Sequence, residues 1–302
     1  YLFLSAGDYV QLADDGLNPD NYQLQAILQR VALPAMTGQT ADCADIRVTQ
    51  AYLQALHDLS RGRLQQNLIE PLWYSELTPP TSPFAPLTPN QRDLGDLQLA
   101  FDEARPNVAQ YQLLRNSYAL MRQRELPNWP LIDSGPLIKP GMSDLRMPAI
   151  EQRLLLEGYL PAVAASPTDL QYNLQRLAAV ENFQLQHGLQ PDGIIGAGTL
   201  AEMNISAATR LDQLRINLER WRWIAPDLEP ESLLVDIDGA QLSYFRDRQL
   251  LWKTRTQVGR AERRTPSIKS MLTRVTLNPT WTVPPTILKK DKLPAIRANP
   301  NF

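Results

Sequence analysis

Cysteine and histidine are scarce in this sequence of 302 residues, which has one cysteine, Cys43, and two histidines, His57 and His187. A single cysteine excludes an internal disulfide and a metal cluster held by several thiolates. A zinc site needs about three nitrogen, oxygen or sulfur ligands at set spacings. Neither histidine stands in an HExxH-like or HxxxD-like pair, so the sequence argues against a zinc hydrolase.

Long apolar runs and a large net charge are also missing. No stretch approaches the ~18 consecutive apolar residues that indicate a membrane span. Residues 1–4 lack a basic n-region and a cleavage site, so we expect them to begin the ordered part of a longer precursor. The 30 basic and 32 acidic side chains give a net charge of −2. This balance predicts no nucleic-acid partner and no electrostatic attraction to an anionic membrane.

Glycine is outnumbered by proline, 14 residues against 25, which favours rigid connections over flexible ones. The densest group of prolines lies in residues 78–90. Proline has no backbone N–H to donate, so this stretch cannot be a helix interior or a central strand. We expect an extended crossover, with prolines at Pro79, Pro80, Pro83, Pro86 and Pro89.

Helical periodicity dominates on both sides of this crossover. Residues 1–75 are predicted to be helical, with apolar residues three and four apart in 24–31 and again in 49–59. A second helical stretch runs from Leu97 to Arg124 and is interrupted at Pro106. One face of it carries Tyr111, Leu114, Tyr118 and Met121.

Residues 145–204 have the pattern of a separate unit of three short helices. The first ends near Gly158, the second has apolar residues repeating from Leu170 to Phe183, and the third runs from Thr199 to Met203. A tight turn at Asp192-Gly193 precedes the third helix. A further amphipathic helix then returns to the helical region through Leu211, Leu214, Leu218 and Trp221.

The period changes from 3.6 to 2 after Pro230, which predicts strands. We expect Leu233, Val235 and Ile237 to alternate on one face of the first strand, followed by a turn at Asp238-Gly239. The return strand has Leu242 and Tyr244, and a third strand covers 251–258. A fourth strand is predicted with Met271, Thr273, Val275 and Leu277 on one face.

The second predicted helix of residues 145–204 leads into a specific sequence string. Phe183-Gln184, His187-Gly188-Leu189 and 192–196 (DGIIG) are followed by Thr199 and Leu200. This string resembles the three-helix peptidoglycan-binding domain of many cell-wall enzymes, over about 60 residues. The resemblance implies that the glycines at 188, 193 and 196 shape turns and touch no ligand. We interpret His187 as a surface or capping residue.

Two later segments resemble the catalytic domain of the L,D-transpeptidases. Residues 258–266 match its VGR…TP loop, and residues 277–288 match its strand of the form NP-W-VP-x-SI. Trp281, between Pro279 and Pro284, is the most distinctive residue of this match. The sequence departs from the pattern at Thr286, where the family often has serine.

The order of these parts resembles the large Gram-negative L,D-transpeptidases, including the RINLERWRW helix of 215–223. The expected fold is α+β. A helical scaffold domain (1–144 and 205–229) contains an inserted peptidoglycan-binding domain (145–204). The first strands of a β-rich catalytic domain (230–302) follow, and we expect this domain to be truncated.

The catalytic residues of that family have no counterpart in this sequence. Its nucleophile is a cysteine in a Ser-His-Gly-Cys stretch, with a histidine upstream as the base, and residues 1–302 have neither. Cys43 lacks the flanking glycine and arginine, and the sequence places no base next to it. We therefore assign no catalytic, cofactor-binding or metal-binding residue.

The resemblance implies acyl transfer without a metal or organic cofactor. A thiolate would attack a tetrapeptide donor stem, and the side-chain amine of an acceptor stem would resolve the thioester into a 3→3 peptidoglycan crosslink. The implied partners are tetrapeptide stems, glycan strands, carbapenem inhibitors and other wall synthases. The implied location is the periplasm, after export or inner-membrane anchoring by a segment preceding Tyr1.

Two other functions stay open at this point. The chain could be a non-catalytic peptidoglycan-binding scaffold that recruits wall synthases. A glycosidase with paired carboxylates is not excluded by the residues either, although no acidic residue of 230–302 stands beside a recognisable substrate motif.

Overall fold

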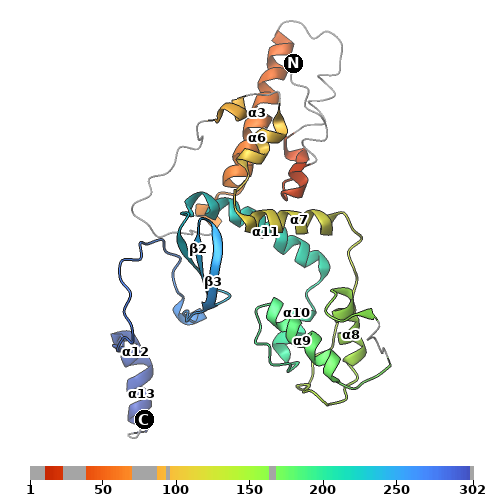
Figure 1. Ribbon diagram of the computed structural model, residues 1–302, viewed down its shortest axis with the longest axis vertical. Coiled ribbons are helices and arrows are strands. Elements are labelled where there is room, and N and C mark those ends of the chain that lie inside the picture. Colours follow the sequence, from red (N-terminus) through yellow and green to blue (C-terminus); the bar gives the residue numbers. More distant parts are fainter. Residues whose placement is uncertain (1–10, 23–38, 70–86, 93–95, 163–167, 300–302) are drawn as a thin grey trace.

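The computed structural model of the protein describes residues 11–22, 39–69, 87–92, 96–162 and 168–299 (Figure 1). Helices make up most of this part of the chain, and three strands form one antiparallel sheet in the order β1-β2-β3. The longer helices precede the sheet along the sequence, and only short helices follow it. The predicted α+β class is thereby confirmed.

The first helical group combines η1 (Pro19–Tyr22), α3 (Gln39–Arg61), α4 (Gln66–Ile69), α5 (Pro89–Arg92) and α6 (Leu97–Ala104). Its core forms where α3 and α6 meet, and Tyr52, Leu59 and Phe101 are buried there. The helix predicted over 49–59 is confirmed within α3. The apolar repeat of 24–31 lies outside the described residues.

The prediction of an extended crossover over 78–90 is wrong at its end. Pro89 begins the one-turn helix α5, with the Thr88 hydroxyl accepting a hydrogen bond from the Gln91 N–H at 3.1 Å. Proline fits the first turn of a helix because that position needs no N–H donor. Pro79, Pro80, Pro83 and Pro86 lie outside the described residues.

The second helical group pairs α7 (Ala109–Arg122) with α11 (Ala207–Ile224), which lie side by side (Figure 1). The predicted break at Pro106 is confirmed. Arg105, the residue before it, ends α6 with extended backbone at φ −68° and ψ 149°, as the proline ring requires. Leu218 and Tyr111 are buried between the two helices.

A buried polar network ties α11 to segments far away in the sequence. The Asp15 carboxylate accepts hydrogen bonds from Arg105 Nε at 3.0 Å, from Arg115 Nε at 3.0 Å and from Tyr111 Oη at 2.9 Å. Arg222 of α11 donates to the Asp15 carbonyl oxygen and to Tyr111 Oη. These contacts join α11 to the helices that precede the inserted unit.

Between α7 and α11 the chain forms a separate three-helix unit of α8 (Met147–Leu156), α9 (Leu174–Gln186) and α10 (Ala197–Met203) (Figure 1). Two isolated antiparallel bridges, Ile138 with Ile195 and Ser143 with Gln171, hold its connecting segments. Its buried residues form a cluster of their own that reaches from Ile132 to Met203. The unit therefore has an independent hydrophobic core.

The predicted start of the second helix in this unit is wrong. Leu170 lies in extended backbone, where its carbonyl accepts from the Asp144 N–H at 3.0 Å. The helix begins at Leu174 because the Asn173 side chain caps it, accepting from the Arg176 N–H at 3.0 Å. Leu174 is 81% exposed, so it does not belong to the core face.

The sheet consists of β1 (Ser232–Asp236), β2 (Gln241–Arg246) and β3 (Gln249–Arg255). Asp236 Oδ1 accepts from the Gly239 N–H at 3.0 Å in the β1–β2 turn, which confirms the predicted reversal. The face that carries Leu233 and Val235 is not the one that packs against the helices. Leu233 and Val235 are 40% and 45% exposed, whereas Leu234 faces the helices.

The predicted fourth strand is wrong, because residues 271–277 have no regular structure. Met271, Val275 and Leu277 are 72–85% exposed. Alternating apolar residues form a strand only beside a partner strand, and β3 pairs with β2 alone among the described residues. The short η3 (Ala225–Asp227), η4 (Ala261–Arg263), α12 (Pro285–Ile287), η5 (Leu288–Lys292) and α13 (Leu293–Ala298) complete the described chain.

Candidate functional site

The turn that follows α9 is organised by one buried amide. Gln184 is 1% exposed, and its Oε1 accepts from the Gly193 N–H at 2.9 Å. Its Nε2 donates to the Ile194 carbonyl at 3.0 Å and to Thr199 Oγ1 at 3.2 Å. One side chain thus links α9, the turn and α10. The glutamine, glycine and threonine of the sequence string are therefore structural partners.

Gly193 itself needs to be glycine at this position. Its φ of +68° lies in the left-handed region, and a Cβ atom there would stand 2.2 Å from Leu177 Cδ1. Tyr172 Oη also donates to the Gly193 carbonyl at 2.7 Å. The interpretation of this glycine as a turn residue agrees with the geometry.

Phe183, in the last turn of α9, and His187, which directly follows α9, pack against each other at the same core. The Phe183 side chain is fully buried, and its ring stacks on the His187 imidazole with centroids 4.0 Å apart. His187 Nδ1 lies 2.8 Å from the Phe183 carbonyl oxygen, which can only accept. Nδ1 therefore carries the hydrogen, and His187 caps the end of α9. Tyr159 packs edge-on against Phe183 at 5.5 Å.

Two arginines are fully buried in this unit. The Arg153 guanidinium carbon lies 3.6 Å from the centroid of the Trp129 ring, and its Nε donates to the Met203 carbonyl at 2.7 Å. Burial lowers the pKa of Arg153 from its usual value. Arg176 Nε donates to Glu151 at 2.7 Å, so a buried ion pair joins α8 to α9.

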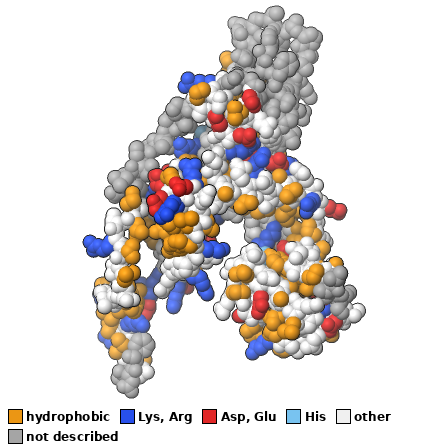
Figure 2. Space-filling model, viewed as in Figure 1, with side chains coloured by type: hydrophobic (Ala, Val, Ile, Leu, Met, Phe, Trp, Pro, Cys, Tyr) orange, Lys and Arg blue, Asp and Glu red, His pale blue; other side chains and the backbone are white. Residues whose placement is uncertain are grey.

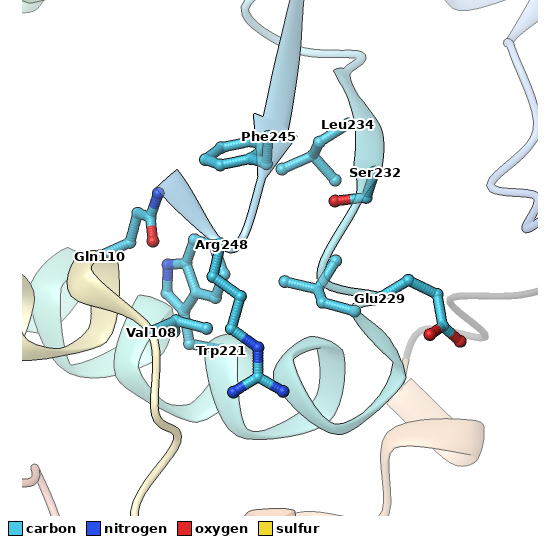
Figure 3. Close-up of a pocket in the computed structure, with 9 residues that line it drawn as sticks. Val108, Gln110, Trp221, Glu229, Ser232, Leu234, Phe245 and Arg248 are labelled. Carbon is cyan, nitrogen blue, oxygen red and sulfur yellow. The ribbon is translucent and has the colours of Figure 1, made fainter. Parts of the chain in front are cut away.

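The sheet meets the helices at a small apolar pocket (Figure 3). Leu234 and Phe245 line it from the strands, and Val108, Trp221 and Leu228 line it from the helical side. Figure 3 shows Glu229 turned away from these side chains. The backbone N–H of Arg248 donates to the Pro230 carbonyl at 3.0 Å. Nothing in the sequence pairs Trp221 with Phe245, so this junction could not be predicted.

The loop of residues 258–266 is closed by its own hydrogen bond. The Gly259 N–H donates to Thr265 Oγ1 at 2.7 Å, and a Cβ at Gly259 would stand 2.0 Å from the Arg263 carbonyl oxygen. The loop therefore requires glycine at this position. Trp281, the other distinctive residue of the matching segments, is 65% exposed, with Lys292 Nζ 5.9 Å from its ring centroid.

The structure does not bring the cysteine and the two histidines together as a described site. Cys43 lies in α3, and its side chain is outside the described residues. His57, also in α3, is partly exposed, with Nδ1 3.3 Å from Asp58 Oδ1. His187 belongs to the separate core of the three-helix unit. The described residues contain no group of three or more metal-ligating side chains and no helix with the length and apolarity to cross a membrane.

Comparison with known proteins gives three family matches in sequence order. Residues 9–117 match a scaffold domain, residues 144–203 a peptidoglycan-binding domain, and residues 230–302 an L,D-transpeptidase catalytic domain. A Haemophilus influenzae protein named as an L,D-transpeptidase is 33% identical over 141 residues. That alignment covers 43% of this chain and 28% of the relative. The chain thus spans less than a third of the relative.

Proposed function

We propose that the chain is part of an L,D-transpeptidase that forms 3→3 peptidoglycan crosslinks by cysteine acyl transfer. The observation that carries this proposal is the succession of three matching domains, of which the second has its own hydrophobic core. In this role the three-helix unit binds peptidoglycan. The helical scaffold carries the start of the catalytic domain beside it.

The proposed chemistry has two covalent steps. A cysteine thiolate attacks the carbonyl after the third residue of a tetrapeptide stem, and the terminal D-alanine leaves as its free amine. The side-chain amine of a second stem then attacks the thioester and releases the thiolate. A thiolate suits both steps, because it is nucleophilic near neutral pH and its thioester reacts readily with amines.

The nucleophile and its base are proposed to lie outside these 302 residues, because no Ser-His-Gly-Cys stretch occurs in them. A carbapenem is expected to acylate the same thiol. The proposed location is the periplasm, where the wall is accessible. These assignments rest on the family, and the described residues contribute the wall-binding and scaffold parts.

We expect the three-helix unit to bind peptidoglycan without the rest of the chain. A fragment of residues 129–206 includes the Trp129–Arg153 contact and the whole separate core. Mixed with insoluble sacculi at about 0.15 M salt, where charges are screened beyond about 8 Å, it should co-sediment. Its affinity should be weak, because so small a domain offers limited contact area.

A second assay, added to the co-sedimentation, separates the proposed enzyme from a non-catalytic scaffold. A folded fragment that stays in the supernatant would contradict the wall-binding role. If wall binding is found, the protein with its catalytic cysteine should produce 3→3-linked dimers from tetrapeptide muropeptides, detected by mass spectrometry. Wall binding without such dimers would favour the non-catalytic scaffold.

A further inference from the structure

The chain has a net charge near zero but consists of two parts whose net charges have opposite signs. Residues 230–302 contain 13 Lys and Arg against 6 Asp and Glu, a net charge of +7. Residues 1–229 contain 17 basic and 26 acidic side chains, a net charge of −9. The part that matches the transpeptidase domain is therefore strongly basic, and the part that precedes it is acidic.

The three-helix unit is acidic, like residues 1–229 as a whole. Residues 144–203 contain three arginines and seven acidic side chains. Arg153, Arg176 and Glu151 are buried and offer no charge to a ligand, which leaves Arg146 and six acidic side chains. The surface of this unit is thus negative and would repel an anionic polymer.

The cations of the basic part lie on its surface, where Figure 2 shows Lys and Arg side chains projecting around the sheet and the segment after it. Lys253 and Arg255 of β3 are exposed, and they stand two residues apart on one face of the strand. Neither of these two side chains forms an ion pair with the described residues. Arg263, by contrast, is paired with Asp291.

Peptide stems carry carboxylates that are ionised at neutral pH, since the pKa of an α-carboxyl group is about 3.5. We infer that residues 230–302 attract these stem carboxylates through Lys253, Arg255 and neighbouring cations. The inference rests on the proposed function, and it assigns the electrostatic attraction of the wall to residues 230–302. Electrostatic attraction of this kind raises the local concentration of the substrate.

The test is co-sedimentation of the full chain with two preparations of sacculi. In one, the carboxylates are native; in the other, they are converted to neutral methylamides with methylamine and a carbodiimide. Salt is varied from about 0.02 M to about 0.5 M, which shortens the screening length several-fold. Binding to native sacculi should weaken steadily with salt. Binding to amidated sacculi should be weaker at low salt and nearly independent of salt.

A pair of matched variants locates the effect on the chain. Lys253→Gln with Arg255→Gln should lower the affinity for native sacculi about two- to tenfold at low salt, from two exposed ion-pair contacts. Arg92→Gln with Arg124→Gln removes the same charge from exposed positions of the acidic part and should change nothing. Equal melting temperatures of the two double variants would show that both are folded.

The outcomes distinguish this inference from the proposed function. Equal, salt-independent binding to native and amidated sacculi overturns the inference and leaves the wall-binding role intact. An equal loss in both double variants also overturns it, because the effect would then follow the total charge. Tighter binding to vesicles of anionic lipid than to sacculi would assign the cations to a membrane instead. No binding to either preparation at any salt contradicts the proposed function itself.

Discussion

Replacing Phe183 with alanine is expected to lower the unfolding free energy of the three-helix unit by about 3–5 kcal/mol, the usual cost of removing a buried aromatic ring. The Phe183 ring is fully buried, stacks on His187 and packs against Tyr159. A domain of this size has only about 5 kcal/mol of stability to lose. The variant should therefore be largely unfolded at 37 °C and should fail to bind sacculi.

Denaturant unfolding of the 129–206 fragment measures this effect, with the fluorescence of Trp129 as the reporter. Leu185→Ala is the matched control, because Leu185 lies in the same helix and is 58% exposed. We expect the control to shift the free energy by less than about 0.5 kcal/mol. A Phe183→Ala midpoint equal to that of Leu185→Ala would show that the core is misplaced.

Replacing Asp15 with asparagine is expected to destabilise the helical scaffold by about 3–5 kcal/mol, because it removes the buried carboxylate that Arg105 and Arg115 share. Asp15 is fully buried and pairs with Arg105 at 2.9 Å and with Arg115 at 3.0 Å. Burial and the nearby carboxylate raise the pKa of Tyr111. The phenol therefore stays protonated and donates to Asp15.

The control for this variant is Asp14→Asn, at the neighbouring position. Asp14 forms an ion pair with Arg122 at 2.6 Å at a partly exposed position, where such pairs contribute at most about 1 kcal/mol. Thermal unfolding of the full chain should show a large loss for Asp15→Asn and a small one for Asp14→Asn. Equal losses would mean that the buried network does not hold α11 to the preceding helices.

The sequence predicted those features that depend on residues close together in the chain. Helix boundaries at Pro106, the turn at Asp238-Gly239 and the tight glycine turn at Gly193 follow from local backbone chemistry. The interpretation of the FQ…DGIIG string was also reliable. It reflects contacts within one small core, such as that of Gln184 with Gly193.

Features that depend on distant residues could not be predicted. Asp15 and Arg222 are joined across 207 positions, and no pattern in either segment signals the other. Alternation puts Leu233 and Val235 on one apolar face of β1. Alternation cannot say which face meets the helices, and the position of Trp221 places Leu234 there instead. The prediction of a fourth strand over 271–277 is wrong for a similar reason, because a strand forms only beside a partner strand.

The total charge averages over parts of the chain that differ in sign. A net charge of −2 gave no reason to expect an anionic partner, yet the basic and acidic residues are distributed unevenly along the chain. Screening limits electrostatic attraction to about 10 Å at 0.1 M salt. A ligand therefore responds to the charge of the domain it meets, and the charge of the whole chain has little influence.

The central claim is that these 302 residues bind the wall and carry the catalytic domain's first strands, while the reacting cysteine lies outside them. Intact-mass measurement of the chain after incubation with a carbapenem tests this most directly. Cys43 is the only thiol in the sequence, and it does not stand in a Ser-His-Gly-Cys stretch. The account predicts an unchanged mass of 34.1 kDa. A carbapenem adduct on Cys43 of the folded chain would contradict it.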